Sequence, residues 1–162
     1  MRYNIKQKIF SFGDNFYVKD DRDNNIFKIQ GKVFALGDKL KLCDMQGKEL
    51  IYIQQKLFKL LPEYNLFRND VLIAKVKKEL SFFKPKFVIE SMMGNYRIEG
   101  EIFSHNFSVT KAGRTVAVVN KKWISFSDTY GVEIDDNEDQ AFMVSLVIVI
   151  DQVIHDNNSN NN

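Results

Sequence analysis

Histidine and cysteine are the side chains of this chain best suited to acid–base or nucleophilic chemistry. The two histidines, His105 and His155, lie far apart in the sequence, and neither belongs to a His-Glu-x-x-His zinc motif. Without a partner motif, we interpret each as a lone surface or capping histidine. The single cysteine, Cys43, lies within a predicted strand and is expected to pack as a small core or face residue. One cysteine cannot form an internal disulfide, which is typical of a reducing compartment and predicts a cytoplasmic protein.

Phosphate-binding and nucleophile motifs are absent from the sequence. Both Gly-Lys pairs, which begin at Gly31 and Gly47, lack the Ser or Thr that must follow the lysine of a P-loop. There is no Gly-x-Gly-x-x-Gly, no Gly-x-Ser-x-Gly and no Cys-x-x-Cys. We therefore predict that the protein is not an enzyme and needs no cofactor. A small hydrolase or transferase is an alternative, and it would require a polar pocket that the sequence does not reveal.

Acidic residues gather between positions 135 and 139, and calcium binding is the chemistry that they suggest. A calcium loop of the EF-hand type that begins at Asp135 has Gln140 in place of its central glycine and Leu146 in place of its final glutamate. A loop that begins at Asp21 fails at the same two positions. We therefore predict no metal site. The acids near 135 are assigned to helix capping and those near 21 to a hairpin turn.

Basic side chains beside aromatic ones give the main indication of a ligand. One group flanks Phe82 and Phe83, and a second surrounds Gly113 and the single tryptophan, Trp123. Such groups suit an anionic membrane surface, where each nearby charge contributes about 1 kcal/mol. The candidate lipid-binding residues are Lys75, Lys77, Lys78, Lys84, Lys86, Lys111, Arg114, Lys121 and Lys122. The alternative is that these side chains only solubilise the outer and edge positions of a sheet.

The overall charge narrows the choice of partner. A formal net charge of +2 is too small for a nucleic-acid-binding protein, which needs a strong basic surface. We expect a non-catalytic binding or scaffold domain that recognises anionic lipid head groups of a membrane, or another protein. Such a domain would be cytoplasmic or peripheral at the membrane, and a monomer is favoured.

Four repeated units predict the elements that hold these side chains. Each unit is two short runs rich in β-branched or aromatic residues around a turn, which is the pattern of a β-hairpin. The units cover residues 16–29, 40–53, 64–74 and 107–119. Gly47 and Gly113 are expected at positive φ in two of the turns, and Asn24 in the first turn. Further runs between and before these units bring the count to about twelve strands of typical length.

Residues 141–150 form the longest apolar run, which only Ser145 interrupts. A membrane span needs about 20 apolar residues, so a run of this length favours a buried core helix over membrane insertion. We predict a helix from about residue 138 to 155, with Asn137 and Gln140 as a capping box at its start. Because this helix is apolar on nearly every side, other elements must surround it.

An enclosed helix sets the size of the sheet around it. A barrel of about eight strands holds only its own side chains or one small ligand, whereas a helix is about 10 Å or more across. Cans of about eleven strands can hold a central helix. The sequence therefore predicts one mainly β domain over residues 1–155, a closed antiparallel barrel of about twelve strands that encloses one hydrophobic C-terminal helix. The polar tail at 156–162 is expected to be disordered.

Three stretches of the sequence resemble the LURP-one-related family of the tubby C-terminal-like superfamily, which is related to the phospholipid scramblases. They read RYNIKQKIFSFGDNFYVKD from Arg2, KVFALGDKLKL from Lys32 and NKKWISFSDTYGVEI from Asn120. The resemblance spans nearly the whole chain and implies a barrel of about twelve strands around a hydrophobic C-terminal helix. It implies no catalytic residues. The scramblase relationship suggests an alternative function, a membrane lipid transporter in which the C-terminal helix leaves the barrel and inserts.

Overall fold

The computed structural model describes residues 1–6, 15–32, 39–81, 85–121 and 128–159. The side chains of Lys32 and of residues 155–159 lie outside this description.

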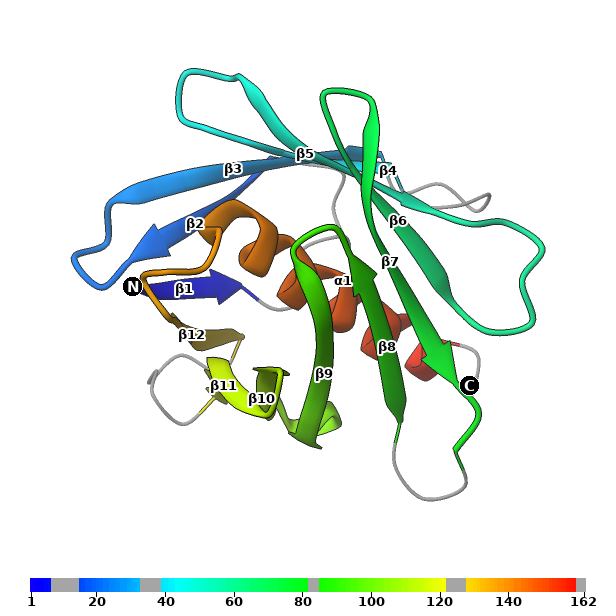
Figure 1. Cartoon of the computed structure of the whole chain (residues 1–162). Helices are drawn as coiled ribbons and strands as arrows, with labels where there is room; N and C mark the ends of the chain where they lie inside the picture. Colours follow the sequence, from blue (N-terminus) through cyan, green and yellow to red (C-terminus); the bar gives the residue numbers. More distant parts are fainter. Residues whose placement is uncertain (7–14, 33–38, 82–84, 122–127, 160–162) are drawn as a thin grey trace.

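Within these residues, twelve antiparallel strands form one closed barrel around a single long helix (Figure 1). Neighbours in the sequence are neighbours in the sheet from β2 to β12, and β1 closes the barrel by pairing with both β12 and β2. The predicted fold class is therefore confirmed. The strands are β1 (Arg2–Lys6), β2 (Phe16–Asp20), β3 (Asn25–Lys32), β4 (Lys39–Cys43), β5 (Glu49–Gln55), β6 (Glu63–Arg68), β7 (Val71–Glu79), β8 (Lys86–Ser91), β9 (Gly94–Glu101), β10 (Asn106–Lys111), β11 (Arg114–Asn120) and β12 (Thr129–Ile134).

The turns of the hairpins follow the sequence signals at two of the three expected positions. Gly47 and Gly113 have φ angles of 87° and 77°, which is the left-handed region that glycine enters without steric cost. In the turn between β2 and β3, however, Asp23 rather than Asn24 has positive φ, at 66°. Asp20 explains this difference, because its carboxylate accepts hydrogen bonds from the backbone N–H groups of both Arg22 and Asn24 and so fixes the loop around Asp23.

The helix α1 (Gln140–Ser159) begins and ends slightly later than predicted, and α1 reaches into the segment expected to be a disordered tail. Its N-cap is Asp139, whose Oδ1 accepts a hydrogen bond of 3.0 Å from the N–H of Phe142. The predicted capping box is therefore wrong. Gln140 instead donates to the carbonyl oxygens of Asp135 and Glu138, and Asn137 donates to the carboxylate of Asp135. No helix in the described residues combines the length and the apolar character that a membrane span requires.

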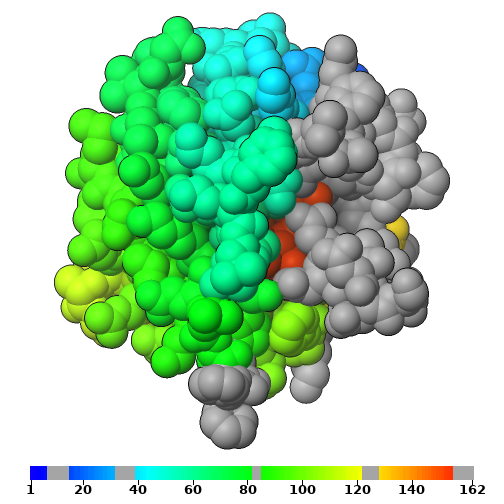
Figure 2. All heavy atoms as spheres, turned by 90° about the vertical axis from the view of Figure 1, so that its right-hand side faces the viewer, coloured from blue at the N-terminus to red at the C-terminus, as the bar shows by residue number. Residues whose placement is uncertain are grey.

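The barrel encloses α1, as the all-round apolar pattern requires. Side chains on every side of the helix have no exposed surface, namely Phe142, Met143, Val144, Leu146, Ile148, Val149 and Ile150. Four tyrosines of the sheet, Tyr3, Tyr64, Tyr96 and Tyr130, are the largest buried side chains between strands and helix. Figure 2 looks at the end where α1 finishes, and a small part of the helix is visible there between the surrounding atoms. The interior is therefore filled by the chain itself.

The two ends of the barrel carry different connections. We call the end where α1 begins the entry end and the end where it finishes the exit end. Because all neighbouring strands are antiparallel, the β2–β3, β4–β5, β6–β7, β8–β9 and β10–β11 connections lie at the entry end. The connections between β5 and β6, β7 and β8, and β9 and β10 lie at the exit end, and the last of these contains the 3-10 turn η1 (Ile102–Ser104).

Candidate functional site

The basic residues predicted to bind lipid do not form one surface. Lys75 and Lys77 point outward from β7, where Glu90 of β8 lies opposite Lys75 in the ladder and forms an ion pair of 3.4 Å with Lys77. Charges of both signs therefore alternate on this wall of the barrel. Such a pattern is typical of a solvated sheet face.

The predicted residues around the fourth hairpin separate to opposite ends of the barrel. Arg114 begins β11 at the entry end, whereas Lys121 follows β11 at the exit end. Seven strand residues at about 3.4 Å each place them roughly 20 Å apart. Lys84 and Lys122 lie outside the described residues.

Lys111 is half-buried at the entry end, where it contacts the buried side chains of Glu138 and Tyr96. Its Nζ atom lies 3.2 Å from both carboxylate oxygens of Glu138 and 5.1 Å from the centre of the Tyr96 ring. The Tyr96 hydroxyl in turn donates a hydrogen bond of 2.8 Å to Glu138. The neighbouring Tyr96 hydroxyl, and then Glu138, raise the pKa of Lys111, while burial raises the pKa of Tyr96. Lys111 therefore holds the start of α1 to the sheet, a role that the sequence did not suggest.

Lys78 and Lys86 lie at the exit end, where β7 finishes and β8 begins. Exposed apolar side chains also lie in the connections at this end, and we call this set the apolar rim. Its members are Leu57, Phe58, Leu60, Leu80 and Phe103. Phe58 is fully exposed and Leu60 is 93% exposed, so both side chains are open to contact with a partner surface.

The β5–β6 connection that carries most of the apolar rim is held firmly at its base. The N–H of Lys56 donates to the carbonyl of Glu63 at 2.8 Å, and the N–H of Lys78 donates to the carbonyl of Pro62 at 3.0 Å. Phe58 has a φ of 58°, which is unusual for an aromatic residue and costs energy. The chain thus presents Phe58 to solvent from a fixed base in a strained conformation. The atoms of this connection project from the centre of the face shown in Figure 2.

Positive charge accompanies the apolar rim. Among the described side chains at the exit end, seven lysines accompany four carboxylates. The lysines are Lys6, Lys39, Lys56, Lys59, Lys78, Lys86 and Lys121, and the acids are Glu63, Glu79, Glu101 and Asp128. The connections of the entry end contain more acids than bases instead, with Asp21, Asp23, Asp44, Asp70, Asp135 and Asp136 beside Arg22 and Lys48. Lysines are therefore in excess at the exit end and acids in the connections of the entry end, whereas exposed apolar side chains occur at both ends.

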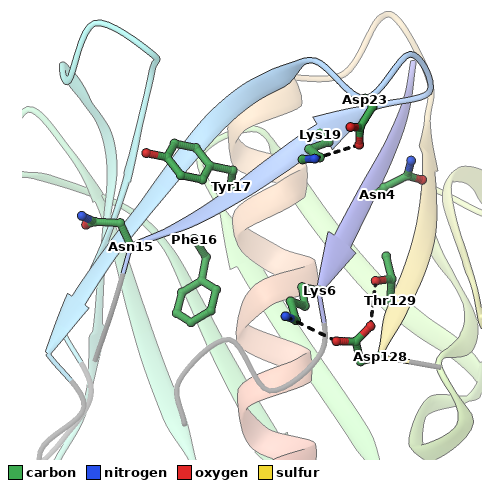
Figure 3. A pocket seen from close by; sticks show the side chains of 9 residues that line it. All are labelled: Asn4, Lys6, Asn15, Phe16, Tyr17, Lys19, Asp23, Asp128 and Thr129. Atoms are coloured by element: carbon green, nitrogen blue, oxygen red, sulfur yellow. Dashed lines mark hydrogen bonds and ion pairs between the residues drawn. The ribbon is translucent and has the colours of Figure 1, made fainter. Parts of the chain in front are cut away.

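A groove of about 770 Å³ lies where β1 and β2 separate (Figure 3). Ion pairs mark its two sides, Lys6 with Asp128 at 3.4 Å and Lys19 with Asp23 at 2.8 Å. The remaining lining side chains are Asn4, Asn15, Phe16, Tyr17 and Thr129. No sequence motif pointed to this groove, because its residues come from β1, β2, β12 and the connections beside them, which only the closed sheet brings together.

His105 is buried, and its prediction as a surface side chain is wrong. Its backbone is the C-cap of η1, which agrees with a capping role, but its side chain is enclosed with the residue only 4% exposed. The Nε2 atom lies 2.5 Å from Oδ1 of Asp151, which is 1% exposed, and the imidazole stacks on Tyr130 with ring centres 4.7 Å apart. Burial, and then the charge of Asp151, raise the pKa of Tyr130 far above its ordinary value. Because the protein itself encloses these groups, they form a structural pair and not a site that substrate contacts.

Cys43 is also buried, at the end of β4, as expected for a small core residue. Burial raises the pKa of its thiol, which disfavours the reactive thiolate. Within the described residues, no group of three or more histidine, cysteine or acidic side chains is placed to hold a metal ion.

A closed, twelve-stranded antiparallel barrel filled by its own C-terminal helix defines the class of protein. Residues 1–151 match the family described as LURP-one-related, and the chain belongs to this family. The chain is 36% identical over 151 residues to the Bacillus subtilis (strain 168) protein named Uncharacterized protein YxjI. The aligned stretch covers 93% of this chain and 92% of that protein. The family resemblance noted from the sequence is therefore confirmed.

A crystallographic structure of an Arabidopsis thaliana protein has a similar fold. Its TM-score is 0.67 at 23% sequence identity, and the match covers 94% of this chain and 91% of that one. At this identity the likeness concerns the fold alone. Neither the family description nor the name of the bacterial relative states a catalytic activity.

Proposed function

We propose that this domain is a non-catalytic binding module that docks at anionic membrane surfaces through its exit end. The observation that carries the proposal is the pairing of the apolar rim with lysines at the same end of the barrel. Fully exposed Phe58 and nearly fully exposed Leu60 supply apolar surface, and Lys56 and Lys59 lie directly beside them in the sequence. Apolar residues flanked by lysines suit the boundary between lipid head groups and acyl chains.

The energies involved fit reversible docking. Full burial of a Phe or Leu side chain contributes about 1.5–3 kcal/mol, and each lysine near an anionic surface contributes about 1 kcal/mol. Phe58, Leu60 and a few lysines therefore supply binding of moderate strength. Carboxylates such as Glu79 and Glu101 at the same end reduce this attraction. Attachment that depends on both charge and apolar contact should weaken as salt is added.

The filled interior argues for an outer binding surface and against lipid transport by the helix. For α1 to insert into a membrane, Asp151 would have to leave His105 and enter the bilayer as an unpaired charge, at a cost of at least about 2.5 kcal/mol. The apolar side chains that α1 buries against the sheet would also be lost from the core. The membrane-docking role requires neither change.

Vesicle flotation tests the proposal. Purified protein would be mixed at low salt with vesicles of phosphatidylcholine alone, or of phosphatidylcholine with phosphatidylserine, and centrifuged through a density gradient. We expect the protein to float with the phosphatidylserine vesicles. The double variant Phe58→Ser/Leu60→Ser should bind at least about tenfold more weakly, because it loses more than 1.4 kcal/mol of apolar contact.

Met92 provides a matched control, since it is 73% exposed but lies in the β8–β9 connection at the acidic entry end. The variant Met92→Ser should float like the unchanged protein. Equal flotation with both kinds of vesicle, or a double variant that floats undiminished, would overturn the proposal.

A further inference from the structure

The seam between β1 and β2 is incompletely paired. The two strands are joined only at Tyr3 with Asp20 and at Asn4 with Lys19. Within the described residues, every other pair of neighbouring strands is joined at four or more positions. Beyond Asn4 the strands diverge and border the groove shown in Figure 3. The barrel thus contains two short strand edges that face each other.

The backbone groups of Lys6 point into this seam. The N–H of Ile134 donates to the carbonyl of Met1 at 2.7 Å, so odd-numbered residues of β1 direct their backbone groups toward β12. Strand residues alternate, so the N–H and C=O of Asn4 and Lys6 are directed toward β2. The ladder to β2 stops at Asn4.

The same alternation applies to β2. The N–H of Asp20 donates to the carbonyl of Asn24 on the β3 side, so the backbone groups of Tyr17 and Lys19 are directed toward β1. Lys19 meets Asn4, whereas Tyr17 has no ladder partner on β1 among the described residues. An N–H and a C=O from Lys6 and from Tyr17 therefore border the groove.

The side chains around these edges suit a polypeptide. Phe16 lines the groove and also packs against the core, which gives an apolar contact for one side chain of a bound strand. Lys6, Lys19 and their partner acids Asp128 and Asp23 offer charges of both signs to side chains on the opposite face. An extended peptide presents alternating side chains and regularly spaced backbone donors and acceptors, which is what this lining matches.

We propose that the β1–β2 seam is a binding site for an extended peptide segment of another protein, which adds as a strand along the edges of Tyr17 and Lys6, where the described residues form no ladder across the seam. The peptide places an apolar side chain on Phe16 and polar side chains between the two ion pairs. This site is separate from the apolar rim and does not depend on membrane docking.

The experiment uses a displayed library of random linear peptides selected on the full chain. The enriched peptide would be synthesised with a fluorophore and titrated by fluorescence anisotropy. Two further versions of it would carry N-methyl groups on alternate backbone nitrogens, one version in each register. Strand addition predicts that methylation in one register weakens binding at least about tenfold, while the other register binds almost normally, because only alternate N–H groups face the partner strand.

Two variants locate the site. Tyr17→Pro removes the N–H that borders the groove but no bond to β3, and it should weaken binding about as much as the harmful methylation. Tyr17→Ala changes the side chain and keeps the N–H, so it should retain most of the affinity. Amide exchange by NMR on the unchanged protein covers the case in which Tyr17→Pro fails to fold, since bound peptide should slow exchange at Tyr17 and Lys6.

Three results would overturn the inference. They are a library that yields no peptide, binding that tolerates methylation in both registers, and a bound peptide that leaves exchange at Tyr17 and Lys6 unchanged.

Discussion

The Nε2 atom of His105 lies 2.5 Å from Oδ1 of Asp151 in the interior of the barrel. Asp151 is the only charged residue between positions 140 and 154 of α1, and His105 belongs to the connection between β9 and β10. The contact therefore fixes the position of the helix along the barrel axis and its rotation about its own axis. Apolar packing alone is less specific, because Val and Ile side chains on neighbouring turns can exchange places at small cost.

The first prediction concerns the stability of this pair. His105→Ala should lower the free energy of unfolding by about 3–5 kcal/mol, because it removes the imidazole that pairs with the buried Asp151 carboxylate. The double variant His105→Phe/Asp151→Leu should recover most of that loss, because apolar side chains of similar size can replace a buried pair. Urea denaturation followed by circular dichroism measures both values.

Glu90→Gln is the control for the first prediction, since it breaks the exposed ion pair with Lys77 and should cost less than about 1 kcal/mol. A His105→Ala protein as stable as this control would show that the buried pair contributes little.

Much of the fold was predictable because its signals are local. Gly47 and Gly113 mark turns by their own backbone preference, and the apolar run at 141–150 shows a helix that must be enclosed. Asp23, and not the predicted Asn24, has positive φ because the carboxylate of Asp20 organises that turn. The backbone preferences of single residues do not reveal this contact.

The candidate site was less predictable because it depends on which residues meet across the barrel. Lys75 and Phe82 are close in sequence, but the alternation along β7 directs Lys75 to a mixed-charge wall. Phe58 was not singled out, although an apolar residue between lysines in a predicted connection was a usable signal. Asp151 was a second usable signal in the sequence, since a charged side chain within an apolar helix requires a buried partner. His105 could be recognised as that partner only from the closed sheet.

The second prediction separates the exit end from the wall formed by β7 and β8. Lys56→Gln/Lys86→Gln removes two exposed charges beside the apolar rim and should weaken binding to phosphatidylserine vesicles by about 2 kcal/mol, or roughly 30-fold. Lys75→Gln/Lys77→Gln removes the same charge from the wall and should weaken binding much less. Equal losses in the two variants would indicate that net charge, and not the exit end, governs attachment. Flotation at several salt concentrations makes the comparison.

The third prediction concerns Gly100, which has a φ of 120° close to β10. A Cβ atom at this position would lie 2.8 Å from the carbonyl oxygen of Asn106 and 2.9 Å from the Cα of Phe107. Gly100→Ala should therefore destabilise the protein by more than about 1 kcal/mol, through backbone strain and collision together. Gly47→Ala is the control, because Gly47 also has positive φ but open space around it, and it should cost less. Thermal unfolding of the two variants ranks them, and a reversed order would contradict the geometry.

The fourth prediction concerns Asp139, which caps α1 and forms an ion pair of 2.6 Å with Arg68 of β6. Burial raises the pKa of Asp139, but the Arg68 guanidinium and the N–H of Phe142 outweigh it and hold the pKa below its ordinary value of 3.8. Removing the cap by Asp139→Ala should cost about 1–2 kcal/mol at neutral pH. Asp136→Ala, at an exposed carboxylate, is the control.

The sign of the pH dependence follows from the lowered pKa of Asp139. The carboxylate is ionised in both the folded and the unfolded chain well above pH 3.8, so its contribution to stability is complete there. As the pH falls below 3.8, the unfolded chain takes up the proton first, and the contribution is lost as the pH passes through the folded-state pKa. The stability difference between the unchanged protein and Asp139→Ala should therefore be constant from about pH 5 to 7 and shrink in acid. Asp139→Asn keeps a capping oxygen without the charge, so its stability should change less steeply below pH 3.8 than that of the unchanged protein. Urea denaturation across this pH range measures the difference, and a gap that widens in acid would show that the carboxylate is not stabilised by Arg68.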